Sequence, residues 1–133
     1  MTLVDTNILI DILSTDQDWQ LWSAAAMRRQ SQNGPLVINE IVYAELAGRY
    51  ATRQALDDVI DSLDLRFEWL PKPALYAAGQ TFSNYRRSGG TRTSILADFF
   101  IGAHAAVSRI PILTRDTARY RTYFPDIELI TPD

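Results

Sequence analysis

The sequence contains no cysteine, and only one of its 133 residues is a lysine. Without cysteine, the chain forms neither disulfides nor thiolate metal sites. No apolar run approaches the ~18 residues that a membrane-spanning helix requires. The N-terminal residues lack the basic and apolar regions of a signal peptide. There is also no internal repeat, low-complexity tract or linker. These absences predict a cytoplasmic protein that does not enter a membrane.

The composition is that of a globular protein with a core of its own. Hydrophobic residues make up 47% of the chain and charged residues 22%. The formal net charge of -3 argues against a protein that binds nucleic acids through a broad basic face. All the basic residues except Lys72 are arginines, which suit bidentate pairing with phosphate or carboxylate groups. Composition therefore leaves phosphate ligands open.

Short apolar segments alternate with helical patterns along the chain. Strands are predicted at residues 3–4, 36–38, 66–70, 112–113 and 128–130, and helices at about 6–13, 19–27, 39–46, 52–63, 73–87, 95–106 and 117–124. Asp16 or Asp18 is expected to cap the second helix and Asn39 the third. Strands that alternate with helices favour a parallel sheet between helix layers. We therefore predict a single α/β domain, an α/β/α sandwich over residues 1–133.

The helix predicted from Ile95 is apolar on nearly every side and carries one carboxylate, Asp98, in its first turn. A helix that is apolar all round is typically buried. A buried carboxylate is costly unless it is paired, hydrogen-bonded or bound to a metal. The alternative is that Asp98 is only a first-turn acid favoured by the helix dipole.

Three other acids are placed to join Asp98 at one edge of the sheet. Asp5 directly follows the first strand, Asp116 follows the strand at 112–113, and Glu45 lies in the helix after the strand at 36–38. Ligands of open parallel sheets bind beyond the carboxyl ends of the strands, so short loops would bring the four acids together. Because no lysine accompanies them, a bound Mg²⁺ or Mn²⁺ is the simplest cation to offset their repulsion. Such an ion can polarise a phosphodiester and activate water.

Each of these acids also has a purely structural interpretation. Asp5 and Asp116 are suited to cap the helices that follow them, and Glu45 to a solvated position on its helix. The small polar residues Thr6, Asn7 and Thr114 are candidates to hydrogen-bond the acids or a bound water, or else to serve in turns and caps.

Three arginines and one glutamate are harder to interpret. Arg86, Arg87 and Arg92 flank Gly89-Gly90 ahead of Asp98, where they suit either RNA phosphates or an ordinary solvated helix end. Glu40 is five residues from Glu45 and so lies on a different helical face, and we assign it no role.

His104, the only histidine, lies in the apolar helix. We expect a packed core or interface histidine rather than a catalytic base, because an oxygen-lined metal site does not need one.

Four motifs, in order along nearly the whole chain, resemble the PIN-domain ribonucleases. They are L-V-D-T-N-I-L-I-D from Leu3, V-I-N-E-I-V-Y-A-E-L from Val37, R-T-S-I-L-A-D-F-F-I-G-A-H-A from Arg92 and I-L-T-R-D from Ile112. Within that family the sequence is most similar to the VapC toxins of type II toxin–antitoxin systems.

The resemblance implies an α/β/α domain, a homodimer, and an acidic pocket that binds Mg²⁺ or Mn²⁺ and hydrolyses RNA, often tRNA or rRNA. By motif position, Asp5, Glu45, Asp98 and Asp116 match the catalytic and metal-binding acids of the family, although the last is often asparagine in relatives. Thr114 matches the hydroxyl residue found ahead of the fourth acid. A VapB-type antitoxin is expected to wrap the toxin and present a basic side chain to the pocket.

Two other phosphate-handling folds fit less well. A haloacid-dehalogenase phosphatase needs a second aspartate two residues after Asp5, where this chain has Asn7, and a later lysine. A response-regulator receiver needs paired early acids and a lysine after the last strands, whereas Lys72 precedes Pro73. We therefore predict a metal-dependent endoribonuclease toxin that uses a metal-activated water. The alternative is a non-catalytic PIN-like module that binds RNA or a protein partner.

Overall fold

The computed structural model describes residues 1–15 and 17–132. Within them, five strands form one parallel sheet in the order β3-β2-β1-β4-β5. The strands are β1 (Thr2–Val4), β2 (Leu36–Ile38), β3 (Leu65–Phe67), β4 (Ile112–Leu113) and β5 (Leu129–Ile130). The predicted parallel sheet is therefore confirmed.

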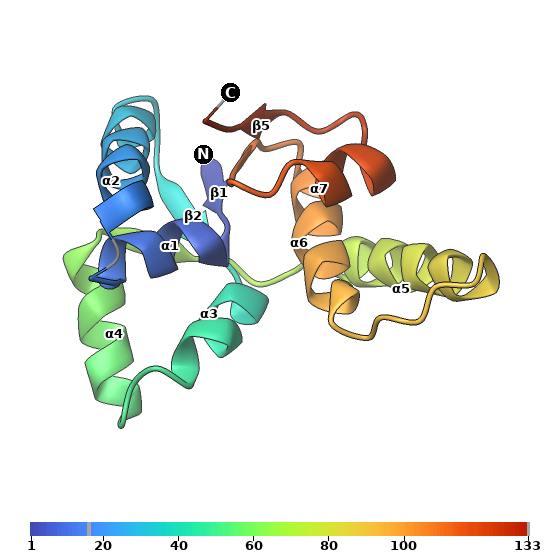
Figure 1. The fold of residues 1–133 in the computed structure, drawn as a ribbon, viewed down its shortest axis with the longest axis horizontal. Helices are drawn as coiled ribbons and strands as arrows, with labels where there is room; N and C mark the ends of the chain where they lie inside the picture. Colours follow the sequence, from blue (N-terminus) through green and yellow to red (C-terminus); the bar gives the residue numbers. More distant parts are fainter. Residues whose placement is uncertain (16, 133) are drawn as a thin grey trace.

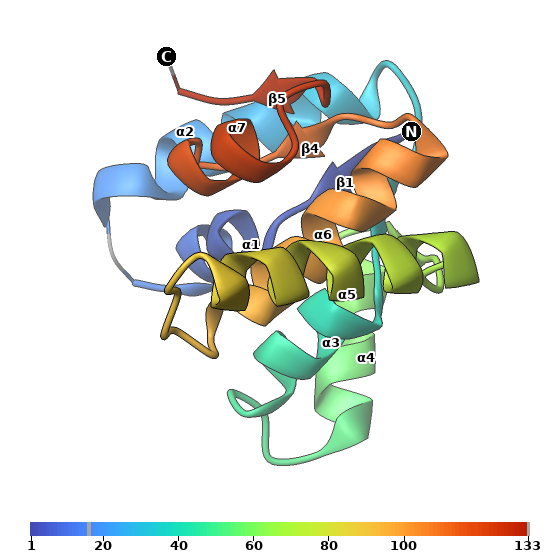
Figure 2. The same ribbon diagram turned by 90° about the vertical axis from the view of Figure 1, so that its right-hand side faces the viewer.

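Helices connect each strand to the next. They are α1 (Thr6–Leu13), α2 (Gln17–Ser31), α3 (Glu40–Ala47), α4 (Arg53–Ser62), α5 (Lys72–Arg87), α6 (Ile95–Ser108) and α7 (Ala118–Tyr123). In Figure 1 the central strands lie between α1 and α2 on one side and α6 and α7 on the other. Figure 2 shows α5 running past α6, against which it packs. The α/β class is confirmed, and no described helix is long and apolar enough to cross a membrane.

The order of the strands reverses at β1. The chain moves outward from β1 to β2 and β3, and then returns to place β4 on the other side of β1. Val4 pairs with Leu113, so Asp5 and Thr114 leave the sheet side by side at its carboxyl edge. The backbone N–H of Asp5 donates to the carbonyl of Leu113 at 3.0 Å. This reversal is the point at which doubly wound sheets bind ligands.

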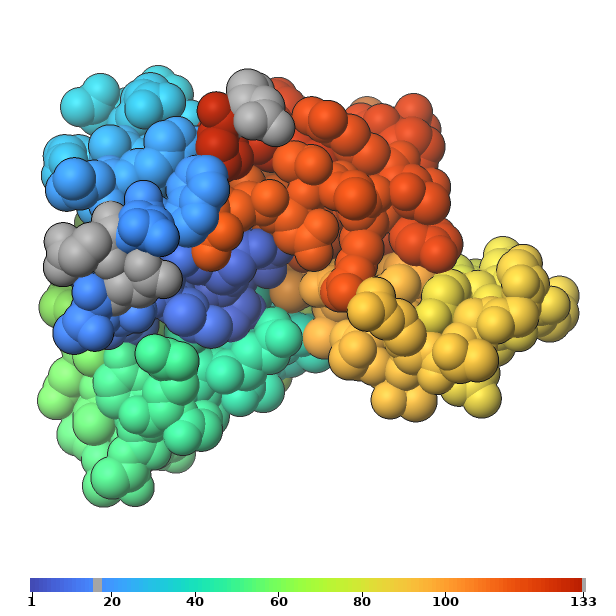
Figure 3. All heavy atoms as spheres, viewed as in Figure 1, coloured from blue at the N-terminus to red at the C-terminus, as the bar shows by residue number. Residues whose placement is uncertain are grey.

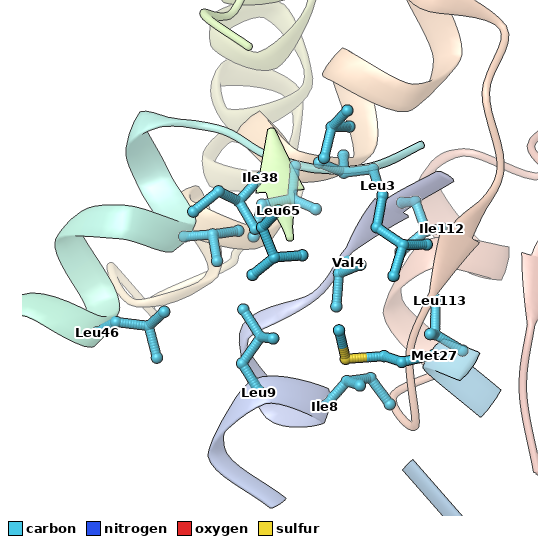
Figure 4. Packing of buried hydrophobic residues seen from close by; sticks show 14 of the residues in the cluster. Leu3, Val4, Ile8, Leu9, Met27, Ile38, Leu46, Leu65, Ile112 and Leu113 are labelled. Carbon is cyan, nitrogen blue, oxygen red and sulfur yellow. The ribbon is translucent and has the colours of Figure 1, made fainter. Parts of the chain in front are cut away.

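The core explains why the central strands are apolar throughout. Leu3 and Val4 of β1 and Ile112 and Leu113 of β4 are fully buried. Figure 4 shows Val4 close to side chains of α1 and to Met27 of α2. Strands covered by helices on both faces need apolar residues in both directions, which accounts for their continuous hydrophobic runs.

The predicted caps are partly confirmed. The side-chain oxygen of Asn39 accepts from the backbone N–H groups of Ile41 and Val42 at the start of α3, both at 3.1 Å. Asp18 lies within the first turn of α2 rather than at its cap. The other candidate cap, Asp16, lies outside the described residues.

The strand predicted at 66–70 is shorter and begins one residue earlier. The backbone N–H of Glu68 makes the last bond to β2, to the carbonyl of Ile38 at 2.9 Å. Beyond that point β2 has turned into α3 at Asn39, so no strand remains to pair with. The N–H of Leu70 instead donates to the carboxylate of Glu40 at 2.8 Å. Apolar and polar residues do alternate from 66 to 69, but the strand stops early because β2, the strand it pairs with, ends at Ile38.

Candidate active site

The four acids singled out in the sequence line one cavity of about 220 Å³. Asp5 follows β1, Glu45 lies in α3, Asp98 in the first turn of α6, and Asp116 follows β4. The other lining residues are Thr6, Asn7 and Ile10. In Figure 3 the dark blue N-terminal segment reaches the surface of the face shown. It lies between teal α3 and orange segments from the last third of the chain.

Asp5 is buried and accepts several hydrogen bonds. Its Oδ1 accepts from the backbone N–H of Thr6 at 2.7 Å, which caps α1. Its Oδ2 accepts from the hydroxyls of Thr114 at 2.8 Å and Tyr120 at 2.9 Å, and from the amide of Asn7 at 3.4 Å. The capping interpretation and the cavity interpretation of Asp5 therefore both hold.

Burial raises the pKa of Asp5 to about 6, because desolvation disfavours its charged form more than the hydrogen bonds from Thr114 and Tyr120 favour it. The negative charge of Asp98 raises this pKa further. Asp5 and Asp98 therefore interact electrostatically although 93 positions separate them in the chain, as expected for acids at the same edge of a sheet.

Asp98 is paired with an arginine of the same chain. The guanidinium of Arg119, in α7, donates to Oδ2 of Asp98. Burial raises the pKa of Asp98, Arg119 lowers it, and the charge of Asp116 raises it again. The absence of lysine near the four acids therefore does not leave them without a cation of the chain. An arginine supplies part of the compensating charge.

The three small polar residues contact the acids. The hydroxyl of Thr6 donates to Glu45 at 2.6 Å. The amide of Asn7 donates to the hydroxyl of Thr114 at 3.2 Å, and its oxygen accepts from the backbone N–H of Arg115 at 3.2 Å. Asn7 therefore ties the segment after β1 to the segment after β4. Of the three, Thr114 also makes a local turn contact, because its hydroxyl accepts from the backbone N–H of Asp116 two residues on.

Asp116 does not cap the following helix. The N-cap of α7 is Thr117, and no side-chain hydrogen bond caps this helix. The backbone N–H of Asp116 instead donates to the hydroxyl of Thr114 at 2.9 Å, which holds the residue at the end of β4. Its partly buried carboxylate lines the cavity.

The residues that line the cavity offer oxygen atoms, the kind of ligand that a hard divalent cation prefers. Their ionisable side chains are all carboxylates, which suit Mg²⁺ or Mn²⁺. In the described part of the chain, however, no three acids or histidines are close enough together to hold one ion. Two of the acids are turned toward protein groups, Asp98 toward Arg119 and Glu45 toward Thr6. The residues fit such an ion in kind, and their side chains would have to rotate to converge on it.

Comparison with known families identifies the fold. The family model described as the PIN domain matches residues 2–125. The chain belongs to the PIN-domain family. This confirms the membership predicted from the four sequence motifs.

Solved structures resemble this PIN domain over its full length. A chain of VapBC2 from Rickettsia felis, bound to a DNA fragment from its promoter, has a TM-score of 0.74 at 17% identity, covering 99% of this chain and 98% of that one. VapBC-1 from nontypeable Haemophilus influenzae gives 0.71 at 18% identity, with 98% and 96% covered. A toxin–antitoxin complex from Klebsiella pneumoniae gives 0.63 at 21% identity, with 100% and 98% covered. No curated protein sequence matched. At these identities the structural similarity establishes the fold.

Three arginines predicted to bind substrate lie outside the acidic cavity of the PIN domain. Arg86, Arg87 and Arg92 are exposed around the connection between α5 and α6 and do not line the cavity. The guanidinium of Arg86 lies 5.8 Å from the ring centroid of Phe82, and that of Arg87 donates to Ser83 at 3.0 Å. Contact between these arginines and RNA stays a prediction.

His104 and Glu40 have structural positions in the PIN domain. His104 is buried, and its Nδ1 lies 3.0 Å from the amide nitrogen of Asn39. Burial lowers the pKa of His104, which favours the neutral ring expected of a core histidine. Glu40 holds the connection that follows β3, because its carboxylate accepts from the backbone N–H of Leu70.

Sequence reasoning missed Arg119 and Tyr120. They follow Asp116 by three and four residues, in the helix that begins just after it. That spacing was visible in T-R-D-T-A-R-Y, but many helices carry an arginine and a tyrosine there. Only the packing of α7 beside α6 shows that Arg119 reaches Asp98 and that Tyr120 reaches Asp5.

Proposed function

We propose that this PIN domain is a metal-dependent endoribonuclease, the toxin of a type II toxin–antitoxin pair, with residues 1–133 acting as one catalytic domain. The observation that carries the proposal is the cavity at the strand-order reversal, where Asp5, Glu45, Asp98 and Asp116 meet. It is supported by the PIN-family match and by structural neighbours that are toxin–antitoxin complexes.

In this proposal the four acids hold Mg²⁺ or Mn²⁺. When bound, such an ion supplies Lewis-acid polarisation of the scissile phosphodiester and lowers the pKa of water. Thr114 and Tyr120 fix Asp5 through its Oδ2, while Oδ1 makes its described hydrogen bond to Thr6. An oxygen with a remaining lone pair is thereby held in a defined orientation at the cavity.

RNA is the proposed substrate, either tRNA or rRNA in the cytoplasm. The net charge of -3 disfavours a broad basic face, so we propose a narrow track marked by exposed arginines. Arg86, Arg87 and Arg92 are the candidates for the outer part of that track.

We also propose two protein partners. A VapB-type antitoxin would inhibit the enzyme by presenting a cation to the acidic cavity, since a carboxylate cluster binds guanidinium groups through charge-assisted hydrogen bonds. A second copy of the chain would form a homodimer.

The decisive experiment is cleavage of a structured RNA pool by purified antitoxin-free protein, with Mg²⁺, Mn²⁺ or EDTA. We expect cleavage that requires metal and that falls at least about 100-fold in Asp98→Asn, the scale of removing one charge-stabilising group from an active site. Asp61→Asn, an exposed acid on α4, is the matched control and should cut like wild type. Folded wild-type protein that cuts no RNA class with either metal would contradict the nuclease.

The ion pair between Asp98 and Arg119 favours one alternative, a PIN-like binding module whose acids serve the structure. That alternative predicts a melting temperature indifferent to millimolar Mg²⁺ or Mn²⁺. Our proposal predicts that metal raises the melting temperature, because it binds the folded state preferentially, and that Asp98→Asn reduces the effect.

A further inference from the structure

Arg119 is placed differently from every other basic residue near the cavity. Of the ion pairs in the described chain, the one that includes a cavity acid is Arg119–Asp98. Arg115 is adjacent in sequence to Thr114 and Asp116, yet its guanidinium turns away and forks onto Asp11 at 2.6 and 2.8 Å. Arg119 is therefore the internal cation of the site.

The environment of Arg119 is that of a counter-charge. Its pKa is raised by the hydrogen bond to Asp98 and by the charges of Asp98 and Asp116, against the smaller opposing effect of burial. The Arg119 side chain is 32% exposed, whereas that of Asp98 is 20% exposed. The long side chain of Arg119 reaches solvent and can leave its partner, whereas the short side chain of Asp98 stays on the first turn of α6 and can only rotate there.

A divalent cation and a guanidinium cannot both occupy Oδ2 of Asp98 without strong repulsion. At contact distances between like charges, even a screened Coulomb interaction is worth more than about 1 kcal/mol. Binding of an ion at this oxygen therefore requires Arg119 to move.

We propose that Arg119 is a built-in counter-cation that competes with the divalent ion for Asp98 and so sets the metal affinity of the cavity. This inference rests on the proposed function, because it requires that a divalent cation binds there. Arg119 acts through Asp98 and is a positioning residue. A purely structural link between α6 and α7 would affect stability without tightening metal binding.

The test is calorimetric titration of Mn²⁺ into wild-type protein, Arg119→Gln and Arg121→Gln. We expect Arg119→Gln to bind Mn²⁺ about three- to tenfold more tightly, because one positive charge has been removed from beside Asp98. Arg121→Gln removes the same charge from an exposed position two residues along α7 and should stay within about twofold of wild type. Circular dichroism checks that each variant is folded.

A second measurement uses wild-type protein alone and so does not depend on a variant that folds. Titration with diamagnetic Mg²⁺, followed by NMR of the arginine Nε–H groups, should shift the Arg119 signal as the pair with Asp98 opens. The Arg115 signal should stay in place and serve as the internal reference.

The possible results separate this inference from the nuclease proposal. Unchanged or weaker Mn²⁺ binding by Arg119→Gln, or an unmoved Arg119 signal at saturating Mg²⁺, would overturn the inference even if wild type binds metal and cuts RNA. A raised KM for RNA with unaltered Mn²⁺ affinity would also overturn it and assign Arg119 to phosphate binding. Tighter Mn²⁺ binding without RNA cleavage would support the inference while the nuclease proposal fails. Absence of metal binding in both proteins would defeat both.

Discussion

His104 shows how one buried side chain makes stability depend on pH. Its ring is enclosed in the core beside Asn39, whose own side chain caps α3. Burial lowers the pKa of His104, and the negative charges of Glu40 and Glu68 oppose that effect. The folded protein therefore binds a proton at His104 less readily than the unfolded chain does.

The sign of the effect follows from proton linkage. Above the unfolded pKa of about 6.5 the ring is neutral in both states, and below it the unfolded chain takes up the proton first. We predict that the free energy of unfolding of wild type falls more steeply between about pH 7 and about pH 5 than that of His104→Asn. Urea denaturation at each pH measures both slopes, and parallel curves would contradict the prediction.

Asparagine is the suitable replacement because its side-chain oxygen can accept from Asn39 much as Nδ1 does, without titrating. The comparison is between slopes, so a constant loss of packing in the variant does not affect it. The carboxylates of the cavity titrate in both proteins, so their contribution to the slope cancels when the two slopes are compared.

At the scale of elements, the connection from β4 to α7 is held by side-chain contacts to two other parts of the fold. Thr114 donates to Asp5, Arg115 reaches to Asp11 of α1, and Asp116 lines the cavity. Asp11 also accepts from Ser23 of α2 at 2.7 Å. One loop is therefore fastened to β1 and to two helices.

We predict that Arg115→Ala lowers the free energy of unfolding by about 2–3 kcal/mol, because it leaves the carboxylate of Asp11 buried without its bidentate partner. The lost guanidinium also lies 4.8 Å from the ring centroid of Trp19, a contact that disappears with it. Urea denaturation measures the change.

The control is Arg53→Ala on α4, whose ion pair with Asp57 is solvent-exposed and should contribute less than about 0.5 kcal/mol. A double-mutant cycle with Asp11→Ala should give a coupling energy of about 1–2 kcal/mol for the Arg115–Asp11 pair. Additive losses would mean that the two residues act independently, contrary to the geometry.

At the scale of the whole molecule, the exposed aromatic residues bear on the proposed homodimer. Trp69 is 70% exposed and Tyr76 is 71% exposed, near the start of α5. The ring of Trp69 packs edge-to-face against Phe67 of the edge strand β3, with centroids 4.8 Å apart. Aromatic side chains at such exposure are typical of protein interfaces.

We predict that light scattering gives twice the 15.1 kDa chain mass and that the double variant Trp69→Ser, Tyr76→Ser shifts the protein toward monomer. Leu21→Ser, at an apolar position on α2 that is 79% exposed, should leave the dimer intact. A dimer that survives the double variant but not Leu21→Ser would move the interface to α2.

Much of the fold was predictable because local patterns carry it. Apolar periodicity located the strands and helices within a few residues, and Asn39 marked the start of α3 by the chemistry of its side chain. The strand at 66–70 was misplaced because its end depends on where β2 ends, which no local pattern in the segment encodes.

The sequence by itself determined the PIN fold and the four carboxylates to examine, because apolar periodicity and motif order are local properties of the chain. Tertiary structure alone decided what those carboxylates contact. Thr114 meets Asp5 across 109 positions, and Arg119 occupies an oxygen of Asp98. Such contacts depend on strand order and on how α7 packs, and local periodicity leaves both unspecified.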